Sequence, residues 1–162
     1  MILKIYDSCI LIRLLEETNC KEIFERWNSN PRYQQWITAE VNGEVGGNAR
    51  KELNDLISRN IINIFDSVPQ TELTKIKDLN PQLSLTDCSL FYYSKKYSNS
   101  ICLSDDNPLR TLFMNQNLCL HGTMGIYLKI KADQLFPLNE IEHKFDKLKK
   151  NTRVFPPNVK IQ

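Results

Sequence analysis

The feature that most constrains the fold is a repeated alternation of short apolar runs with longer segments of helical periodicity. Within NARKELNDLISRN, for example, Leu53, Leu56 and Ile57 fall on one face of a helix. Strands that alternate with helices are typical of a parallel sheet covered on both faces, so we expect a three-layer α/β/α fold with a central parallel sheet. The expected strands are ILKIY (2–6), YQQWIT (33–38), IINIF (61–65), SICLS (100–104) and LCLH (118–121), of which IINIF is the strongest.

Local signals predict where the helices begin and end. SCILIRLLEE follows the first strand with Asp7 or Ser8 as its cap, and Ser84 and Asp87 have the spacing of a capping box. A helix that follows YQQWIT is broken by Gly46-Gly47 before NARKELNDLISRN resumes the pattern. The other expected helices are KEIFERWN, TELTKIKDLN, PLRTLFMNQN, GTMGIYLKIKAD and LNEIEHKFDKLKK, and an irregular tail, 151–162, follows them.

Length and composition favour one soluble domain. A chain of 162 residues fits a single domain, 1–162, and a net charge of +2 is too small to indicate a nucleic-acid binder by itself. The five cysteines have no CxxC spacing and neither histidine has a cysteine pair nearby, so we expect reduced thiols and no zinc site. A signal peptide and an apolar run of about 18 residues are both absent from the sequence, so the expected location is the cytoplasm, without membrane association.

Four acidic residues that are far apart in the sequence follow, or lie opposite, the ends of predicted strands. Asp7 follows ILKIY, Glu44 lies in ITAEVNGEV, Asp87 lies in LSLTDCSL and Asp106 follows SICLS. The carboxyl ends of parallel strands share one edge of the sheet, where α/β proteins bind ligands. Two carboxylates about 4 Å apart repel by roughly 4 kcal/mol at an effective dielectric of about 20, so such a cluster needs protons, basic partners or a divalent cation. The cation would make the chain a metal-dependent enzyme that acts on phosphates.

Each of these acids also has a purely structural explanation when it is taken alone. Asp7 can cap a helix, and Asp105 and Asp106 can stabilise a turn. Glu44 can be a solvated helix carboxylate, as can Glu40 one turn earlier. The set as a whole favours Mg²⁺ or Mn²⁺, which take oxygen ligands and activate water for phosphate chemistry. The patterns GxGxxG and GxxxxGK[ST] are absent from the sequence, which disfavours a nucleotide-binding function.

Four segments together resemble the PIN-domain family of metal-dependent ribonucleases. IYDSCILIRLL is similar to the family's opening strand with its Asp, and the spacing within ITAEVNGEV points to Glu44 rather than Glu40. LSLTDCSLFYYSKK and ICLSDDNPLRTLF are similar to the third and fourth acidic motifs. By its spacing from Ser104, Asp106 is the fourth acid and Asp105 is its variable neighbour. HGTMGIYLKIKADQLFPL resembles the C-terminal half of prokaryotic toxin-like members, so the resemblance covers almost the whole chain.

The resemblance implies a parallel sheet of strand order 3-2-1-4-5, with Mg²⁺ or Mn²⁺ held by Asp7, Asp87 and Asp106. Glu44 would be a further ligand or the base that orients water, and the reaction would be hydrolysis of RNA phosphodiester bonds. Many small bacterial and archaeal members are toxins of toxin–antitoxin pairs, which implies RNA as the substrate, a protein antitoxin as a partner, and a homodimer. Two alternatives stay open: a non-catalytic PIN-fold binding or regulatory protein, and a nuclease that acts on structured DNA.

Two hydroxyls and one guanidinium lie next to these motifs. Ser8 and Ser104 are placed either to donate hydrogen bonds to the carboxylates or to serve as ordinary cap and turn hydroxyls. Arg110 lies one turn after Asp106, where it is a candidate for phosphate binding or for pairing with Asp105 or Asp106.

Overall fold

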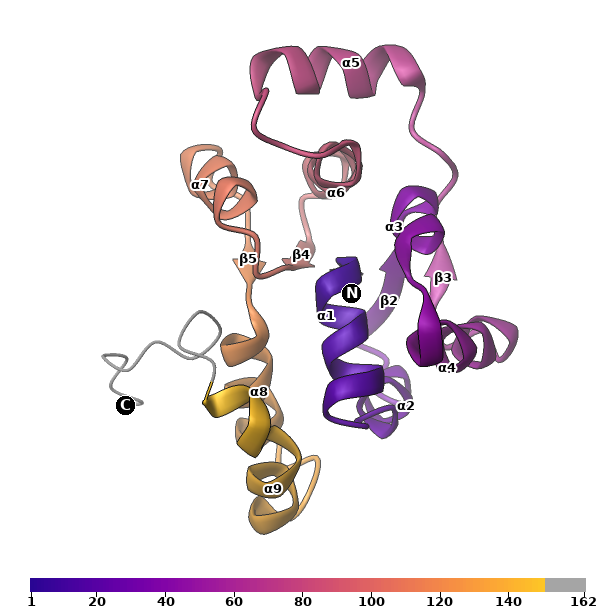
Figure 1. The fold of residues 1–162 in the computed structure, drawn as a ribbon, viewed down its shortest axis with the longest axis vertical. Coiled ribbons are helices and arrows are strands. Elements are labelled where there is room, and N and C mark those ends of the chain that lie inside the picture. Colours follow the sequence, from indigo (N-terminus) through magenta and orange to yellow (C-terminus); the bar gives the residue numbers. More distant parts are fainter. Residues whose placement is uncertain (151–162) are drawn as a thin grey trace.

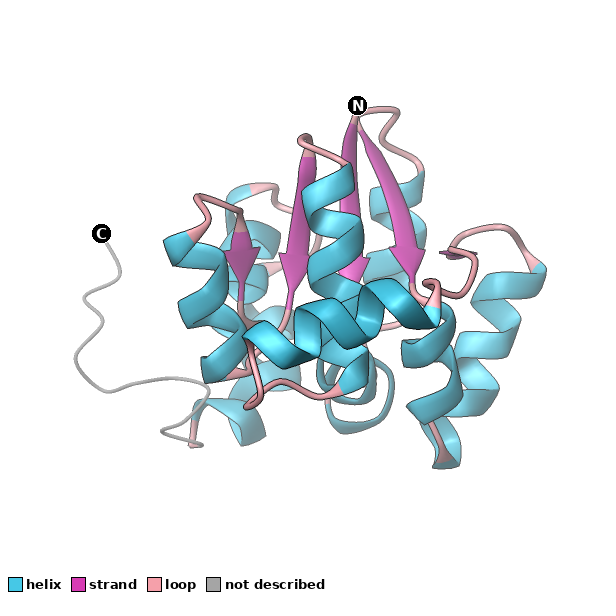
Figure 2. Ribbon diagram, turned by 90° about the horizontal axis from the view of Figure 1, so that it is seen from above, coloured by secondary structure: helices cyan, strands magenta, loops and turns pink. Residues whose placement is uncertain are grey.

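The sheet at the centre of the molecule has five parallel strands in the order β3-β2-β1-β4-β5. The computed structural model describes residues 1–150, and the predicted tail, 151–162, lies outside them. Figure 2 shows helices in front of and behind the sheet, which makes the three layers. The predicted α/β/α fold and the strand order 3-2-1-4-5 are therefore confirmed. The strands are β1 (Ile2–Tyr6), β2 (Tyr33–Ile37), β3 (Asn63–Ile64), β4 (Ser100–Leu103) and β5 (Leu120–His121).

The strands are connected by helices, as the periodicity of the sequence predicts. The first helix continues directly into a π-helical turn, η1 (Arg13–Glu17). In Figure 1 the last two helices lie next to each other, and the first of them follows directly from β5. None of the helices within residues 1–150 has the length and apolar character needed to cross a bilayer. The α-helices are α1 (Ser8–Ile12), α2 (Glu22–Asn28), α3 (Ala39–Glu44), α4 (Gly47–Ser58), α5 (Gln70–Leu79), α6 (Leu85–Lys96), α7 (Asn107–Asn115), α8 (Thr123–Ala132) and α9 (Leu138–Lys149).

β1 occupies the centre of the sheet because it pairs with a strand on each side. Ile5 lies opposite Trp36 of β2 and opposite Cys102 of β4. Ile5 and Tyr6 point to opposite faces of the sheet and are both fully buried, as expected of a strand covered on both sides. The Tyr6 hydroxyl donates to Gln35 Oε1 at 2.8 Å, which satisfies this buried polar group. The residue after β1 therefore lies in the middle of the sheet edge.

Two predicted strands are shorter than the sequence indicates. β3 contains only Asn63–Ile64, so the prediction that IINIF is the strongest strand is wrong. Ile61 and Ile62 are buried, but their backbone N–H groups donate to Leu56 O, at 2.9 and 3.3 Å, near the end of α4. These two residues complete the helix terminus instead of pairing with β2, because burial alone satisfies their apolar side chains. In LCLH, likewise, only Leu120 and His121 form a strand, β5, which pairs with β4.

The helix boundaries follow the local signals closely. Ser84 and Asp87 form the predicted capping box at the start of α6. Val45 and Gly46 separate α3 from α4, and Gly47, the first residue of α4, has a φ of +59°, a conformation that L side chains rarely adopt. The chain can therefore turn sharply directly after Glu44. All five cysteines are free thiols, in agreement with the prediction.

Candidate active site

Acidic side chains from separate parts of the chain line one pocket at the carboxyl ends of the strands. The pocket has a volume of about 330 Å³. Asp7 follows β1, Glu44 ends α3, Asp87 lies in the first turn of α6, and Asp106 directly precedes α7. The structure thus brings all four predicted site residues to the same place. The lining residues are Asp7, Ser8, Cys9, Arg13, Glu44, Ser84, Thr86, Asp87, Asp105 and Asp106.

Asp7 is the most buried of these acids, with 6% of its surface exposed. It occupies the N-cap position of α1, but its side chain makes no capping hydrogen bond to that helix. Its Oδ2 atom instead accepts hydrogen bonds from Ser104 Oγ at 2.6 Å and from Cys9 Sγ at 3.0 Å, and Ser8 Oγ lies 3.3 Å from Oδ1. An ordinary cap therefore does not explain Asp7. Its neighbours hold the carboxylate at the pocket wall.

Glu44, and not Glu40, lies in the pocket. Its carboxylate is exposed at the end of α3, where Oε2 accepts from Ser8 Oγ at 3.0 Å and Oε1 accepts from Thr86 Oγ1. Glu40 lies outside the pocket lining and accepts a hydrogen bond from the backbone N–H of Val68 at 3.2 Å. The two hydroxyls orient Glu44, whereas Glu40 fixes a loop.

Asp87 combines a structural role with a place in the pocket. Its Oδ2 atom accepts from the backbone N–H of Ser84 at 2.8 Å and from Ser84 Oγ at 2.7 Å. Burial raises the pKa of Asp87, the Ser84 hydrogen bonds oppose that shift, and the charges of Asp106 and Asp7 raise the pKa further. The three carboxylates are therefore close enough to repel one another. A cation among them would relieve that repulsion.

The adjacent residues Asp105 and Asp106 have different partners. Asp106 caps α7 by accepting from the backbone N–H of Leu109 at 2.7 Å. Asp105 forms an ion pair with Arg13 and accepts from the backbone N–H of Thr123 at 2.9 Å, at the start of α8. The charge of Asp105 is thus neutralised within the chain. That of Asp106 has no such ion-pair partner among residues 1–150.

Three contributors to the site were missed by reasoning from sequence. Arg13 is distant in sequence from its partner Asp105, and its only signal was a charged residue within the apolar run CILIRLL. Nothing in the local sequence distinguishes Thr86, whose hydroxyl reaches Glu44 only because α3 packs beside α6. A Cβ at Gly122 would overlap Asp105 Oδ1 and lie 2.8 Å from Arg110 Nη2, so a larger residue there would have to displace these side chains. Arg110 itself donates to Ser104 O at 3.4 Å.

The donor atoms of the pocket suit a hard divalent cation. Its lining contains five carboxylates and a single guanidinium, so negative charge is in excess. Burial raises the pKa of the Cys9 thiol and the charge of Asp7 raises it further, so a thiolate does not compete with the oxygen ligands that Mg²⁺ and Mn²⁺ prefer. Within residues 1–150, no group of three or more His, Cys, Asp or Glu side chains is arranged to hold an ion unaided. A cation here would keep several of its own waters, as Mg²⁺ usually does.

Comparisons with known proteins identify the family of the chain. The crystal structure of PAE2754 from Pyrobaculum aerophilum is similar, with a TM-score of 0.57 and 12% sequence identity, and the match covers 81% of this chain and 90% of that chain. At that identity the likeness concerns the fold. No protein with a curated description matches the sequence significantly. The family model DUF3368, which describes a PIN domain, matches residues 3–160. Because this match spans nearly the whole sequence, the chain belongs to the PIN-domain family DUF3368 and has a nuclease-like fold.

Proposed function

We propose that this PIN domain is a Mg²⁺- or Mn²⁺-dependent endoribonuclease that hydrolyses RNA phosphodiester bonds. The observation that supports the proposal is the meeting of four carboxylates, from four separate segments, in one pocket at the sheet edge. In this proposal Asp7, Asp87 and Asp106 hold the cation. Glu44 is a further ligand or the base that orients water.

The neighbouring side chains suit these roles because they orient the carboxylates. Ser104 and Cys9 hold one oxygen of the buried Asp7, which fixes the direction of its carboxylate. Ser8 and Thr86 hold the two oxygens of the exposed Glu44 at the open side of the pocket, where it can accept a proton from water. A bound divalent cation would supply the charge that activates this water and stabilises the leaving oxygen of the phosphodiester.

The choice of RNA and a role as a toxin are supported by the resemblance of the motifs to toxin-like PIN proteins. The segment 121–138 carries the likeness to those members, for which a protein antitoxin and a homodimer are the expected partners. Expression of the chain should slow growth, and a small reading frame beside its gene should restore it. Unimpaired growth together with RNA cleavage in vitro would favour RNA processing instead.

A non-catalytic binding protein is the second candidate. It is favoured by the open arrangement of the acids, because no group of three potential ligands in residues 1–150 encloses an ion unaided. The full set of acids favours the enzyme. Comparing RNA, structured DNA and a phosphomonoester as substrates separates the two, and also tests the alternative of a nuclease for structured DNA. Binding of RNA without cleavage in Mg²⁺ or Mn²⁺ would support the second candidate.

Calorimetric titration with Mn²⁺ tests the site directly. The variant Asp87→Asn removes a pocket carboxylate but can still accept hydrogen bonds from Ser84, so its melting temperature should match that of wild type. The control Asp78→Asn removes an exposed carboxylate on α5, outside the pocket. We expect wild type and the control to bind Mn²⁺ and to cleave RNA, and Asp87→Asn to lose both properties. Failure of wild type to bind Mn²⁺, even with RNA present, would contradict the enzymatic proposal.

A further inference from the structure

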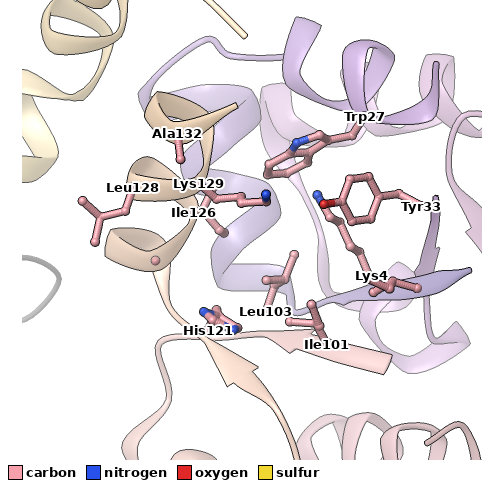
Figure 3. Close-up of a pocket in the computed structure, with 12 residues that line it drawn as sticks. Lys4, Trp27, Tyr33, Ile101, Leu103, His121, Ile126, Leu128, Lys129 and Ala132 are labelled. Carbon is pink, nitrogen blue, oxygen red and sulfur yellow. The ribbon is translucent and has the colours of Figure 1, made fainter. Parts of the chain in front are cut away.

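A second cavity lies between the sheet and α8, and it shares no residue with the acidic pocket (Figure 3). Its volume is about 560 Å³, which is within the usual range for small-molecule sites. Most of its walls are apolar. The lining residues are Ile2, Lys4, Trp27, Tyr33, Ile101, Leu103, His121, Gly125, Ile126, Leu128, Lys129 and Ala132.

Lys4 is the unusual member of this lining. It lies in β1, is only 4% exposed, and extends toward the rings of Trp27 and Tyr33 (Figure 3). Its Nζ atom lies 2.9 Å from the centroid of the Trp27 ring and 4.0 Å from that of Tyr33. Among residues 1–150, no acceptor forms a hydrogen bond with this amine. Burial lowers the pKa of Lys4 to about 6, so the amine is neutral at pH 8.

Trp27, which also lines this cavity, carries a second unsatisfied donor. The residue is 2% exposed, and its Nε1–H has no acceptor among residues 1–150. Buried donors are nearly always hydrogen-bonded in folded proteins, because leaving one unpaired costs its full hydration. Both donors lie beside one apolar cavity, and a group that carries acceptor oxygens would satisfy them.

The charged groups around Lys4 favour an anion as that missing group. Asp133, which follows α8, raises the pKa of Lys4, and Lys129 of α8 lowers it. The carboxylate of Asp133 is already paired with Lys129, at 2.6 Å, and so does not serve Lys4. On the opposite wall, burial and the charge of Arg110 lower the pKa of His121, which leaves it neutral at pH 8. Tyr33 also lines the cavity, and none of the lining residues within 1–150 is an acid that would repel a bound anion.

We propose that this cavity binds a small amphipathic carboxylate, whose head accepts hydrogen bonds from Lys4 and Trp27 and whose apolar body packs on the sheet and α8. The carboxylate supplies the acceptor that both donors lack, and the apolar walls account for the size of the cavity. A bound carboxylate stabilises the ammonium form of Lys4. Binding at pH 8 therefore draws a proton from the buffer, and no covalent bond forms or breaks.

Calorimetric titration with sodium octanoate at pH 8 tests the site, with octan-1-ol as the uncharged comparison. Performing the titration in two buffers of different ionisation enthalpy measures the protons that are exchanged. We expect saturable binding with uptake of about one proton per octanoate, and weaker binding of octan-1-ol. Absence of saturable octanoate binding would overturn the proposal, and so would equal affinity for the alcohol.

Three variants locate the bound octanoate. Lys4→Met keeps the length of the side chain without the amine and should weaken octanoate binding by at least about tenfold and abolish proton uptake. Ala132→Trp fills the mouth of the cavity from an exposed position on α8 and should also weaken binding. Lys51→Met, which removes an exposed lysine from α4, should bind octanoate like wild type. Wild-type affinity in both Lys4→Met and Ala132→Trp would overturn the proposal.

Discussion

The buried amine of Lys4 makes a quantitative prediction about how the stability of this protein depends on pH. The pKa of this lysine falls from 10.5 to about 6 on folding, mainly because burial disfavours the ammonium. Between these two values the unfolded chain binds one proton more than the folded chain. Stability therefore rises with pH across this window, and the destabilisation is complete below the folded pKa.

The magnitude follows from the size of the shift. One proton contributes about 1.4 kcal/mol per pH unit, so the free energy of unfolding of wild type should gain roughly 2.7 kcal/mol from this lysine between pH 7 and pH 9. At pH 7 the buried lysine costs roughly 5 kcal/mol relative to a group with an unshifted pKa. Lys4→Met lacks this titration. Its stability advantage over wild type should therefore be large at pH 7 and much smaller at pH 9.

Urea denaturation of wild type and Lys4→Met at pH 7 and pH 9 measures this effect. The difference in unfolding free energy between the two proteins is compared at the two pH values, so that the contributions of other titrating groups cancel. Lys51→Met is the matched control, because it removes a lysine that is exposed on α4. A constant difference between wild type and Lys4→Met at the two pH values would refute the reasoning. It would show that Lys4 stays protonated in the fold, held by the ring faces of Trp27 and Tyr33.

Three further predictions concern the acidic pocket. Asp106→Asn should lower metal-dependent RNA cleavage more than Asp105→Asn does, because the charge of Asp105 is already neutralised by Arg13. The reverse order in a cleavage assay would assign the metal-binding role to Asp105. Gly122→Ala should lower stability by about 1–3 kcal/mol in thermal unfolding, since its Cβ would overlap Asp105, and an unchanged melting temperature would show that the carboxylate moves aside freely. Ser84→Ala should cost about 0.5–2 kcal/mol of stability through the lost cap. It should also raise the pKa of Asp87, measured by a carboxyl titration followed by NMR, because the Ser84 hydrogen bond favours the charged carboxylate. An unchanged pKa would show that the Ser84 hydroxyl does not stabilise the charged form.

The sequence by itself determined the features that depend on neighbouring residues. The alternation of strands and helices specified the three-layer fold, because hydrophobic periodicity is a local property of each segment. The capping box of Ser84 and Asp87 was predictable for the same reason, since both residues lie within one helical turn. The break at Gly46-Gly47 follows from the backbone freedom of glycine alone.

The tertiary structure decided which side chains meet, because contacts between distant segments depend on packing that no local pattern encodes. Glu44 and Glu40 lie on the same helix, and although the spacing of the motif already pointed to Glu44, it is the packing of α1 and α6 against α3 that brings its carboxylate into the pocket. The pairing of Arg13 with Asp105 assigns different roles to two adjacent aspartates. Likewise Lys4 is an ordinary charged residue in a strand pattern, and only the closure of Trp27 and Tyr33 over it removes its amine from water.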